Sequence, residues 1–177
     1  MSEPQADSRP AELEKLVIRF KELDSRKSAF RPRDMLLERF DRDRYSVVGR
    51  PGEGSSADKA SGAVDAFSVV YVRCEPGKGI APHAHDSSEV FIILSGTWEV
   101  SSGGARTQLE AFDVISVPPG AMHGLVNVGT ESGVAMAINE GKAGVAITLA
   151  PEILAELRAN GHDVADIEYP PGCAPTD

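Results

Sequence analysis

The stretch PGKGIAPHAHDSSEVFIILSG, residues 76–96, contains two of the four histidines of this 177-residue chain, just ahead of a long apolar run. In a β-strand, residues i and i+2 point to the same face, so His83 and His85 are predicted to project together. The polar segment 86–88 has turn chemistry and reverses the chain into the next strand. Glu89 begins that strand and can face back toward both imidazoles, so three ligand-type side chains are expected to converge.

A fourth candidate ligand lies downstream, in DVISVPPGAMHGLVNVG, residues 113–129. A Pro-Pro-Gly turn ends at Gly120, and His123 then enters a new strand whose later residue Asn127 shares its face. Three imidazoles and one carboxylate form a borderline-hard donor set that suits Fe, Mn, Ni, Co or Zn. The sequence therefore predicts a site for one divalent transition metal, with the ligands His83, His85, Glu89 and His123.

From Ala66 onward the sequence consists of short β-rich runs separated by turns. Strands are predicted in FSVVYVRC, EVFIILS, TWEVSS, DVISV, AMHGLVNV, GVAMAIN and GVAIT. Such closely spaced strands are typical of an antiparallel sandwich or barrel. After them, Pro151 suits the first turn of a short helix and Gly161 its end, with Ile153, Leu154 and Leu157 on one face.

The N-terminal region is predicted to be helical. Its apolar residues fall on one helical stripe: Leu13, Leu16, Val17, Phe20 and Leu23. A shorter helix is predicted over 34–40, and the small, polar residues 51–65 are predicted to form a flexible linker. We therefore divide the chain into a helical or extended arm (1–50), the linker (51–65), an all-β barrel (66–150) and a C-terminal helix with its tail (151–177).

The two histidine-containing segments resemble the two motifs of the cupin superfamily, a family of small jelly-roll barrels. The first motif, G-x5-H-x-H-x3-E-x6-G, is matched in full by Gly77, His83, His85, Glu89 and Gly96. The second motif, G-x5-P-x-G-x2-H-x3-N, is matched by Pro118, Gly120, His123 and Asn127, while Phe112 replaces its leading glycine. The resemblance implies an all-β fold, a single cupin-type antiparallel β-barrel of jelly-roll type, flanked by the N-terminal helical arm and the short C-terminal helix. It also implies a homodimer.

The ligand set favours an enzyme, because four protein ligands leave open positions on an ion that prefers five or six. Our leading hypothesis is a dioxygenase-type oxidative cleavage of a small organic substrate chelated to the metal, with O2 as the second substrate. Glu89 is the predicted catalytic residue, since a carboxylate can leave the metal and act as a base. Two alternatives stay open: an O2-independent isomerase, lyase or decarboxylase, and a non-catalytic small-molecule-binding or regulatory protein.

Strand alternation extends the predicted site to side chains that share a face with the ligands or enter the first motif. The substrate-pocket candidates are Tyr71, Arg73, Phe91, Ile93, Leu125, Asn127 and Met136. In the other register of the late strand, Ala135 and Ala137 take the inner positions instead. For each candidate, packing in the core is the competing interpretation.

Composition argues against several classes of partner. The net charge of −9 and pI of about 4.9 argue against general nucleic-acid binding, which needs a basic surface. No apolar run approaches the ~20 residues of a membrane span. The polar start MSEPQADSRP shows no secretory signal, and two cysteines are too few for a disulfide framework. We therefore expect a cytoplasmic protein whose partners are a small-molecule substrate and a second copy of itself, without nucleic acid or membrane.

Overall fold

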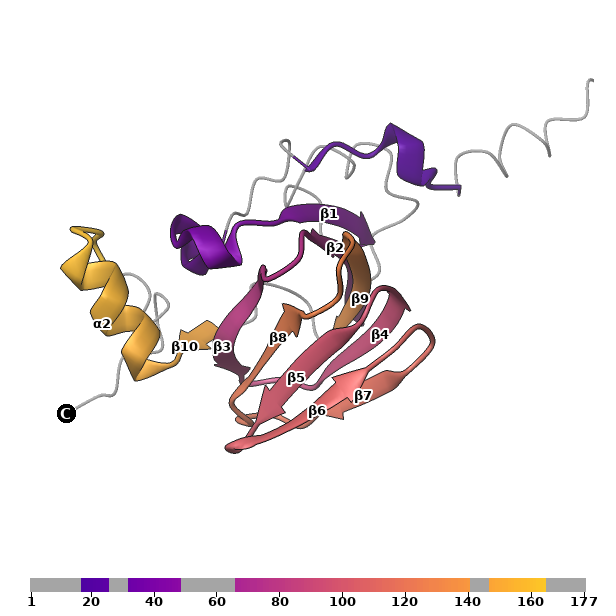
Figure 1. Ribbon diagram of the computed structural model, residues 1–177. Coiled ribbons are helices and arrows are strands. Elements are labelled where there is room, and N and C mark those ends of the chain that lie inside the picture. Colours follow the sequence, from indigo (N-terminus) through magenta and orange to yellow (C-terminus); the bar gives the residue numbers. More distant parts are fainter. Residues whose placement is uncertain (1–16, 26–31, 49–65, 141–146, 165–177) are drawn as a thin grey trace, which may run out of the picture.

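The computed structural model describes residues 17–25, 32–48, 66–140 and 147–164, which form mainly β-strands (Figure 1). The strands are β1 (Asp43–Val48), β2 (Phe67–Cys74), β3 (Gly79–His85), β4 (Glu89–Ser95), β5 (Trp98–Ser102), β6 (Ala105–Leu109), β7 (Val114–Val117), β8 (His123–Asn127), β9 (Gly133–Glu140) and β10 (Ile147–Leu149). The helical elements are the 3₁₀ turns η1 (Phe20–Glu22), η3 (Arg33–Leu36) and η4 (Glu38–Phe40) and the α-helix α2 (Pro151–Ala159). Within these ranges, no helix combines the length and apolar character needed to cross a membrane.

Two five-stranded sheets face each other as a jelly-roll sandwich (Figure 1). The first sheet has the order β1-β2-β9-β4-β7 and the second the order β10-β3-β8-β5-β6. Every strand pairing is antiparallel. Within the described ranges, no hydrogen-bonded ladder joins the two sheets, so the barrel is an open sandwich. The predicted antiparallel jelly-roll class is confirmed.

The main core lies between the sheets because each strand turns one apolar face inward. On β4, Phe91 and Ile93 are buried, while the alternate residue Ile92 is only half-buried on the outer face. Trp98 and Leu125 supply the opposite wall from the second sheet. Burying one such large side chain stabilises the fold by about 1.5–3 kcal/mol.

A second apolar cluster packs α2 against the outer side of β3 and β10. Ile153, Leu154 and Leu157 are buried as predicted and belong to one apolar cluster with Phe40 of η4 and Leu149 of β10. Pro151 occupies the first turn, and Gly161 ends the helix with a φ of 80°. The predicted C-terminal helix is therefore confirmed.

The N-terminal region differs from the predicted helices. Over residues 33–40, the turns η3 and η4 replace one short helix, because Leu37 between them is extended. Helices this short are marginal on their own, so packing decides their geometry. Of the predicted helix 13–23, the described part holds only the turn η1. The rest of that helix and the predicted linker 51–65 lie outside the described residues.

Residues 43–48 form β1, which the division at residue 50 had placed in the arm. This strand pairs with β2, with Tyr45 opposite Tyr71. The segment DRYSVV contains the strand formers Tyr45, Val47 and Val48, but it is short and its partner strand begins only at Phe67, and no strand was predicted there. The arm therefore contributes an edge strand to the first sheet.

A buried ion pair fixes this part of the chain to β3. Arg42 donates to Asp34 at 2.8 Å, and both side chains are almost fully buried. Asp34 also accepts a hydrogen bond from the amide of Ala81 at 3.1 Å, and Arg42 donates to the carbonyl of Gly79 at 3.3 Å. These contacts hold the beginning of the strand that carries two of the predicted ligands.

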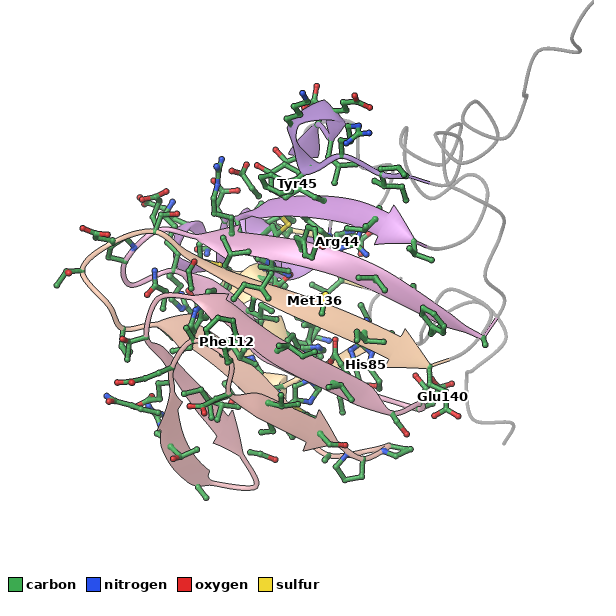
Figure 2. The ribbon with its side chains drawn as sticks, turned by 90° about the vertical axis from the view of Figure 1, so that its right-hand side faces the viewer. Arg44, Tyr45, His85, Phe112, Met136 and Glu140 are labelled. Atoms are coloured by element: carbon green, nitrogen blue, oxygen red, sulfur yellow. The ribbon has the colours of Figure 1, made fainter. Side chains whose placement is uncertain are left out.

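Figure 2 looks onto the outer face of the first sheet, where apolar side chains lie beside the exposed ion pair of Arg73 and Asp43. Met136 lies there between its cross-strand partners Tyr71 and Ile92. Phe20 of the arm packs on Tyr45 and Tyr71, with ring centroids 4.9 and 5.8 Å apart. The arm thus covers part of this face.

Candidate metal centre

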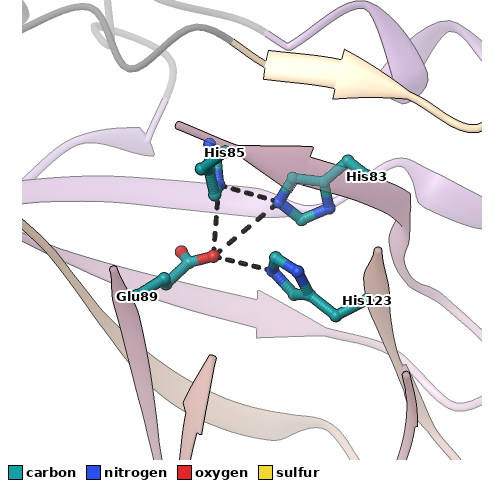
Figure 3. Close-up of side chains that lie close together, drawn as sticks. All are labelled: His83, His85, Glu89 and His123. Carbon is teal, nitrogen blue, oxygen red and sulfur yellow. Dashed lines mark hydrogen bonds and ion pairs between the residues drawn. The ribbon is translucent and has the colours of Figure 1, made fainter. Parts of the chain in front are cut away.

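Four buried polar side chains meet between the two sheets (Figure 3). His83 and His85 come from β3, Glu89 from the start of β4 and His123 from the start of β8. Their ligand atoms all lie within 4.8 Å of one another. None of these residues is more than 8% exposed. The structure therefore brings together the four side chains that the sequence singled out as ligands.

The register of β3 and β8 places the histidines. His83 lies directly opposite His123, and Ile80 lies opposite Leu125, so β3 has one extra residue in this interval. This bulge turns Ile80 and His83, three residues apart, to the same interior face. Close strand approach also matters: a Cβ at Gly79 would lie 2.0 Å from the carbonyl oxygen of Leu125. Only glycine fits there.

Backbone carbonyls orient two of the imidazoles. Nδ1 of His83 lies 2.8 Å from the carbonyl oxygen of Ala81, and Nδ1 of His123 lies 2.9 Å from that of Ala121. A carbonyl oxygen only accepts hydrogen bonds, so each Nδ1 carries the proton. In the neutral ring Nε2 then carries the lone pair and faces the cluster, which is the tautomer that a metal-binding histidine needs.

The inward-facing atoms lie close together. Oε2 of Glu89 is 2.8 Å from Nε2 of His123 and 3.1 Å from Nε2 of His85. The Nε2 atoms of His83 and His85 are 3.0 Å apart. Nε2 of His83 and Oε2 of Glu89 are acceptors, so such spacing requires either protons on Nε2 of both His85 and His123 or a cation among the four atoms. The donor set fits a divalent transition metal.

Burial and neighbouring groups set the charge of the cluster. Burial, helped by the nearby His123, lowers the pKa of His83 to about 4. Burial acts to raise the pKa of Glu89, but the hydrogen bonds from His123 and His85 outweigh it and lower that pKa to about 2. At neutral pH, His83 is neutral and Glu89 is ionised, which are the forms that bind a cation.

Three of the predicted pocket residues face the interior. The ring of Phe91 lies 5.8 Å, centroid to centroid, from that of His123. Ile93 and Leu125 are completely buried in the core between the sheets. Phe91 therefore borders the cluster, whereas Ile93 and Leu125 serve the packing of the core.

The structure gives Asn127 a different role from the predicted one. Its Nδ2 donates to the carbonyls of Cys74 and Glu131 at 2.9 and 2.8 Å, and its Oδ1 accepts from the amide of Gly129 at 3.0 Å. These three hydrogen bonds use both polar atoms of the side-chain amide and connect the end of β2 with the loop between β8 and β9. Asn127 therefore does not contribute to the pocket, although it faces the interior like His123.

Tyr71 and Arg73 lie on the wrong face of β2 for the predicted pocket. Val70 and Val72 take the buried inner positions, so alternation turns the predicted residues outward. There Arg73 donates from Nε to Asp43 at 3.0 Å. The sequence FSVVYVRC has apolar residues on both faces, so its pattern did not fix which face is buried.

Met136 is also on the outer face (Figure 2). Ala135 and Ala137 take the inner positions of β9, which is the alternative register that the sequence analysis left open. These small side chains face the interior from the strand beside Glu89. The pocket prediction for Met136 is wrong.

Sequence reasoning missed two kinds of feature at this centre. The carbonyls of Ala81 and Ala121 orient imidazoles, but any residue offers a carbonyl, so no sequence signal marks them. Asn139 lies opposite Glu89 across the β4–β9 pairing. Its position beside Glu89 depends on the register of β4 and β9, which no local sequence pattern determines.

Comparisons with known proteins agree with this fold. The family model for the cupin domain matches residues 70–139. A cupin 2 domain-containing protein from Halorhodospira halophila is 22% identical, with a TM-score of 0.51, over 68% of this chain and 78% of its own. The DMSP lyase DddQ from Ruegeria pomeroyi is 21% identical, with a TM-score of 0.53, over 73% and 59%. An oxalate decarboxylase from Lactobacillus farciminis is 19% identical, with a TM-score of 0.51, over 65% and 33%.

These structural similarities establish the fold alone, because the identities are low. No curated protein sequence matches the chain significantly.

Proposed function

This chain belongs to the cupin superfamily, and we propose that it is a metal-dependent enzyme acting on a small organic substrate. The observation that carries the proposal is the buried cluster of one carboxylate and three imidazoles, two of them oriented by backbone carbonyls. His83, His85, Glu89 and His123 would hold one divalent transition metal. When bound, such an ion supplies Lewis-acid or redox chemistry at positions that the protein ligands leave open.

The residues around the cluster favour a substrate with an apolar part. Phe91, Ala137 and Val117 belong to the apolar core beside it. Apolar walls exclude water and strengthen the interactions of polar groups inside the site. A small, mostly apolar molecule that also carries oxygen atoms for chelation suits such surroundings. Oxidative cleavage with O2, of the dioxygenase type, is the reaction that we propose first.

Glu89 is the proposed proton acceptor. Its contacts with the three imidazoles all involve the same oxygen, Oε2, and Figure 3 shows the other carboxylate oxygen directed away from them. This second oxygen is the atom that we propose takes a proton from a substrate. The same feature favours an O2-independent isomerase, lyase or decarboxylase as the second candidate, since proton transfer requires no oxidant.

Oxygen consumption and product formation on a panel of catechols, β-diketones and flavonols separate these reactions. The metal-loaded wild type is compared with Glu89→Gln, which keeps the shape of the side chain but removes the carboxylate, and turnover is expressed per bound metal ion because Glu89 is also a proposed ligand. The proposal expects turnover with matching O2 uptake, and at least a hundredfold slower turnover in Glu89→Gln. Turnover that continues without O2 would refute the dioxygenase and support the second candidate. Binding without turnover on any substrate would indicate a non-catalytic protein.

The homodimer implied by the family resemblance stays a prediction. We propose the outer face of the first sheet as its interface, because Tyr71, Met136 and Ile92 form an apolar, half-exposed surface there. Light scattering should give twice the chain mass for the wild type and a smaller mass for Met136→Lys. A monomeric wild type would contradict this prediction.

A further inference from the structure

On three neighbouring strands of the first sheet, the inner face carries a polar row at the level of Glu89. Asn139 of β9 lies directly opposite Glu89 of β4 on one side and opposite Ser68 of β2 on the other. On β9 the buried Ala135 and Ala137 face inward, so alternation directs Asn139 to the same side. Directly paired residues of antiparallel strands have Cβ atoms about 5 Å apart. Asn139 is thus the polar neighbour of the candidate ligand on this sheet.

The next row toward the core is entirely apolar. Val70, Ala137 and Phe91 occupy the corresponding positions on β2, β9 and β4. The inner face therefore changes from polar to apolar between one row of paired residues and the next. A molecule lying across both rows would meet apolar walls at one end and a polar amide at the other.

Buried polar atoms without hydrogen-bond partners concentrate at this end of the sandwich. Over the described part of the chain, four side-chain atoms are in this state: Arg42 Nε, His85 Nδ1, Ser87 Oγ and Asn139 Oδ1. His85 is a candidate ligand, Ser87 lies in the turn between His85 and Glu89, and Asn139 is paired with Glu89. Folded proteins satisfy nearly all buried polar groups, so these atoms are available to form hydrogen bonds with a bound molecule.

The end of β9 is held in place close to this turn. The amide of Glu140 donates to the carbonyl of Ser88 at 3.0 Å, and the Ser88 amide donates to the Glu140 carboxylate at 3.3 Å. Figure 2 labels Glu140 and His85 at the same end of the molecule. The backbone on both sides of Asn139 is therefore fixed, which positions its side chain without using the Oδ1 atom.

We propose that Asn139 is a specificity-determining residue of the site, and that its Oδ1 accepts a hydrogen bond from an N–H or O–H group of the substrate. The inference rests on the proposed function and narrows the substrate class. The substrate carries metal-chelating oxygen atoms, an apolar part that faces Phe91 and Ala137, and a neutral hydrogen-bond donor beside the chelating group. Hydroxamates, hydroxyketones and hydroxylated aromatic compounds have this chemistry.

A matched pair of chelators tests the proposal. Acetohydroxamic acid and N-methylacetohydroxamic acid offer the same two oxygen atoms, but only the first has an N–H donor. Each is titrated into Co²⁺-loaded protein, and affinity is read from the visible absorption of Co²⁺. Wild type should prefer the N–H compound about five- to tenfold, which is the effect of one hydrogen bond to a buried acceptor.

Three variants complete the experiment. Asn139→Ala should reduce the preference to about twofold or less, whereas Asn139→Asp keeps an acceptor and should retain it. Ile138→Val changes the neighbouring residue on the outer face and should leave the preference unchanged. Circular dichroism of each variant checks that it is folded.

The outcomes separate the two proposals. If wild type binds both chelators but shows the same preference as Asn139→Ala, the role of Asn139 is refuted and the metal site stands. If wild type fails to bind Co²⁺, the proposed function and the role of Asn139 both fail. A preference that only Asn139→Ala loses supports the proposal.

Discussion

Replacing His83 by asparagine should remove a defined part of the pH dependence of stability. The asparagine amide can still donate to the carbonyl of Ala81, but it does not titrate. The pKa of His83 is about 4 in the fold and about 6.5 when the chain is unfolded. Since the folded pKa is the lower one, the unfolded chain binds the extra proton, and stability falls as the pH drops from about 6.5 toward 4.

The size of the effect follows from these two values. Their difference of roughly 2.5 pH units, at about 1.4 kcal/mol each, corresponds to about 3 kcal/mol of unfolding free energy. About 2 kcal/mol of this is already lost at pH 5. The low pKa of Glu89 adds its own loss only below its unfolded value of about 4.5. The interval between pH 7.5 and pH 5 therefore keeps the loss from Glu89 small, and comparison with a variant lacking the His83 imidazole separates the contribution of His83 from that of the other histidines.

Urea unfolding at these two pH values, in the presence of a chelator, measures the effect. The metal-free wild type should lose about 2 kcal/mol more than His83→Asn between pH 7.5 and pH 5. Because each protein is compared with itself at the two pH values, any change in stability that the substitution causes at neutral pH cancels. Equal losses in the two proteins would show that His83 is not held neutral by its surroundings.

Three further predictions concern positions outside the cluster. Asp34→Ala leaves the buried charge of Arg42 without its ion-pair partner and should lower the unfolding free energy by about 3–5 kcal/mol. The Asp34→Leu, Arg42→Met double variant removes both charges and should lose less than half as much. Equal losses for the two variants in urea unfolding would argue against the buried pair. Phe112 has a φ of 76° and is 83% exposed, so Phe112→Gly should stabilise the fold by about 0.5–1 kcal/mol, and a lower melting temperature would contradict this. Burial raises the pKa of Cys74 to about 12, so in a Cys173→Ser background its thiol should react with a disulfide reagent only after unfolding; rapid reaction of the native protein would disprove its burial.

The candidate ligands were predictable because their placement depends on local rules. His83 and His85 are two residues apart in a strand, and a short turn separates them from Glu89. His123 follows a Pro-Gly turn at a fixed motif spacing. Alternation and turn chemistry act over a few residues and account for His83, His85 and Glu89, whereas His123 was placed by the resemblance to the second motif.

The pocket walls were not predictable in the same way. Tyr71 and Met136 lie on strands with apolar residues on both faces, so only packing against the second sheet decides which face is buried. β1 pairs with β2 across a long intervening segment, which local patterns do not register. Phe112 adopts the left-handed conformation in place of the motif glycine, and its amide donates to the carbonyl of Ile93 on the neighbouring strand β4 at 2.8 Å.

The metal content of the purified protein tests the central claim most directly. Three proteins are purified without chelator or added metal: wild type, a His83→Ala, His123→Ala double variant and a His162→Ala control. Their metal content is measured by elemental mass spectrometry. The account predicts about one divalent transition-metal ion per chain in wild type and in the control, and less than about a tenth of that in the double variant, with all three folded. Equal metal content in the double variant and wild type, or a wild type that binds no transition metal even when it is supplied, would contradict it.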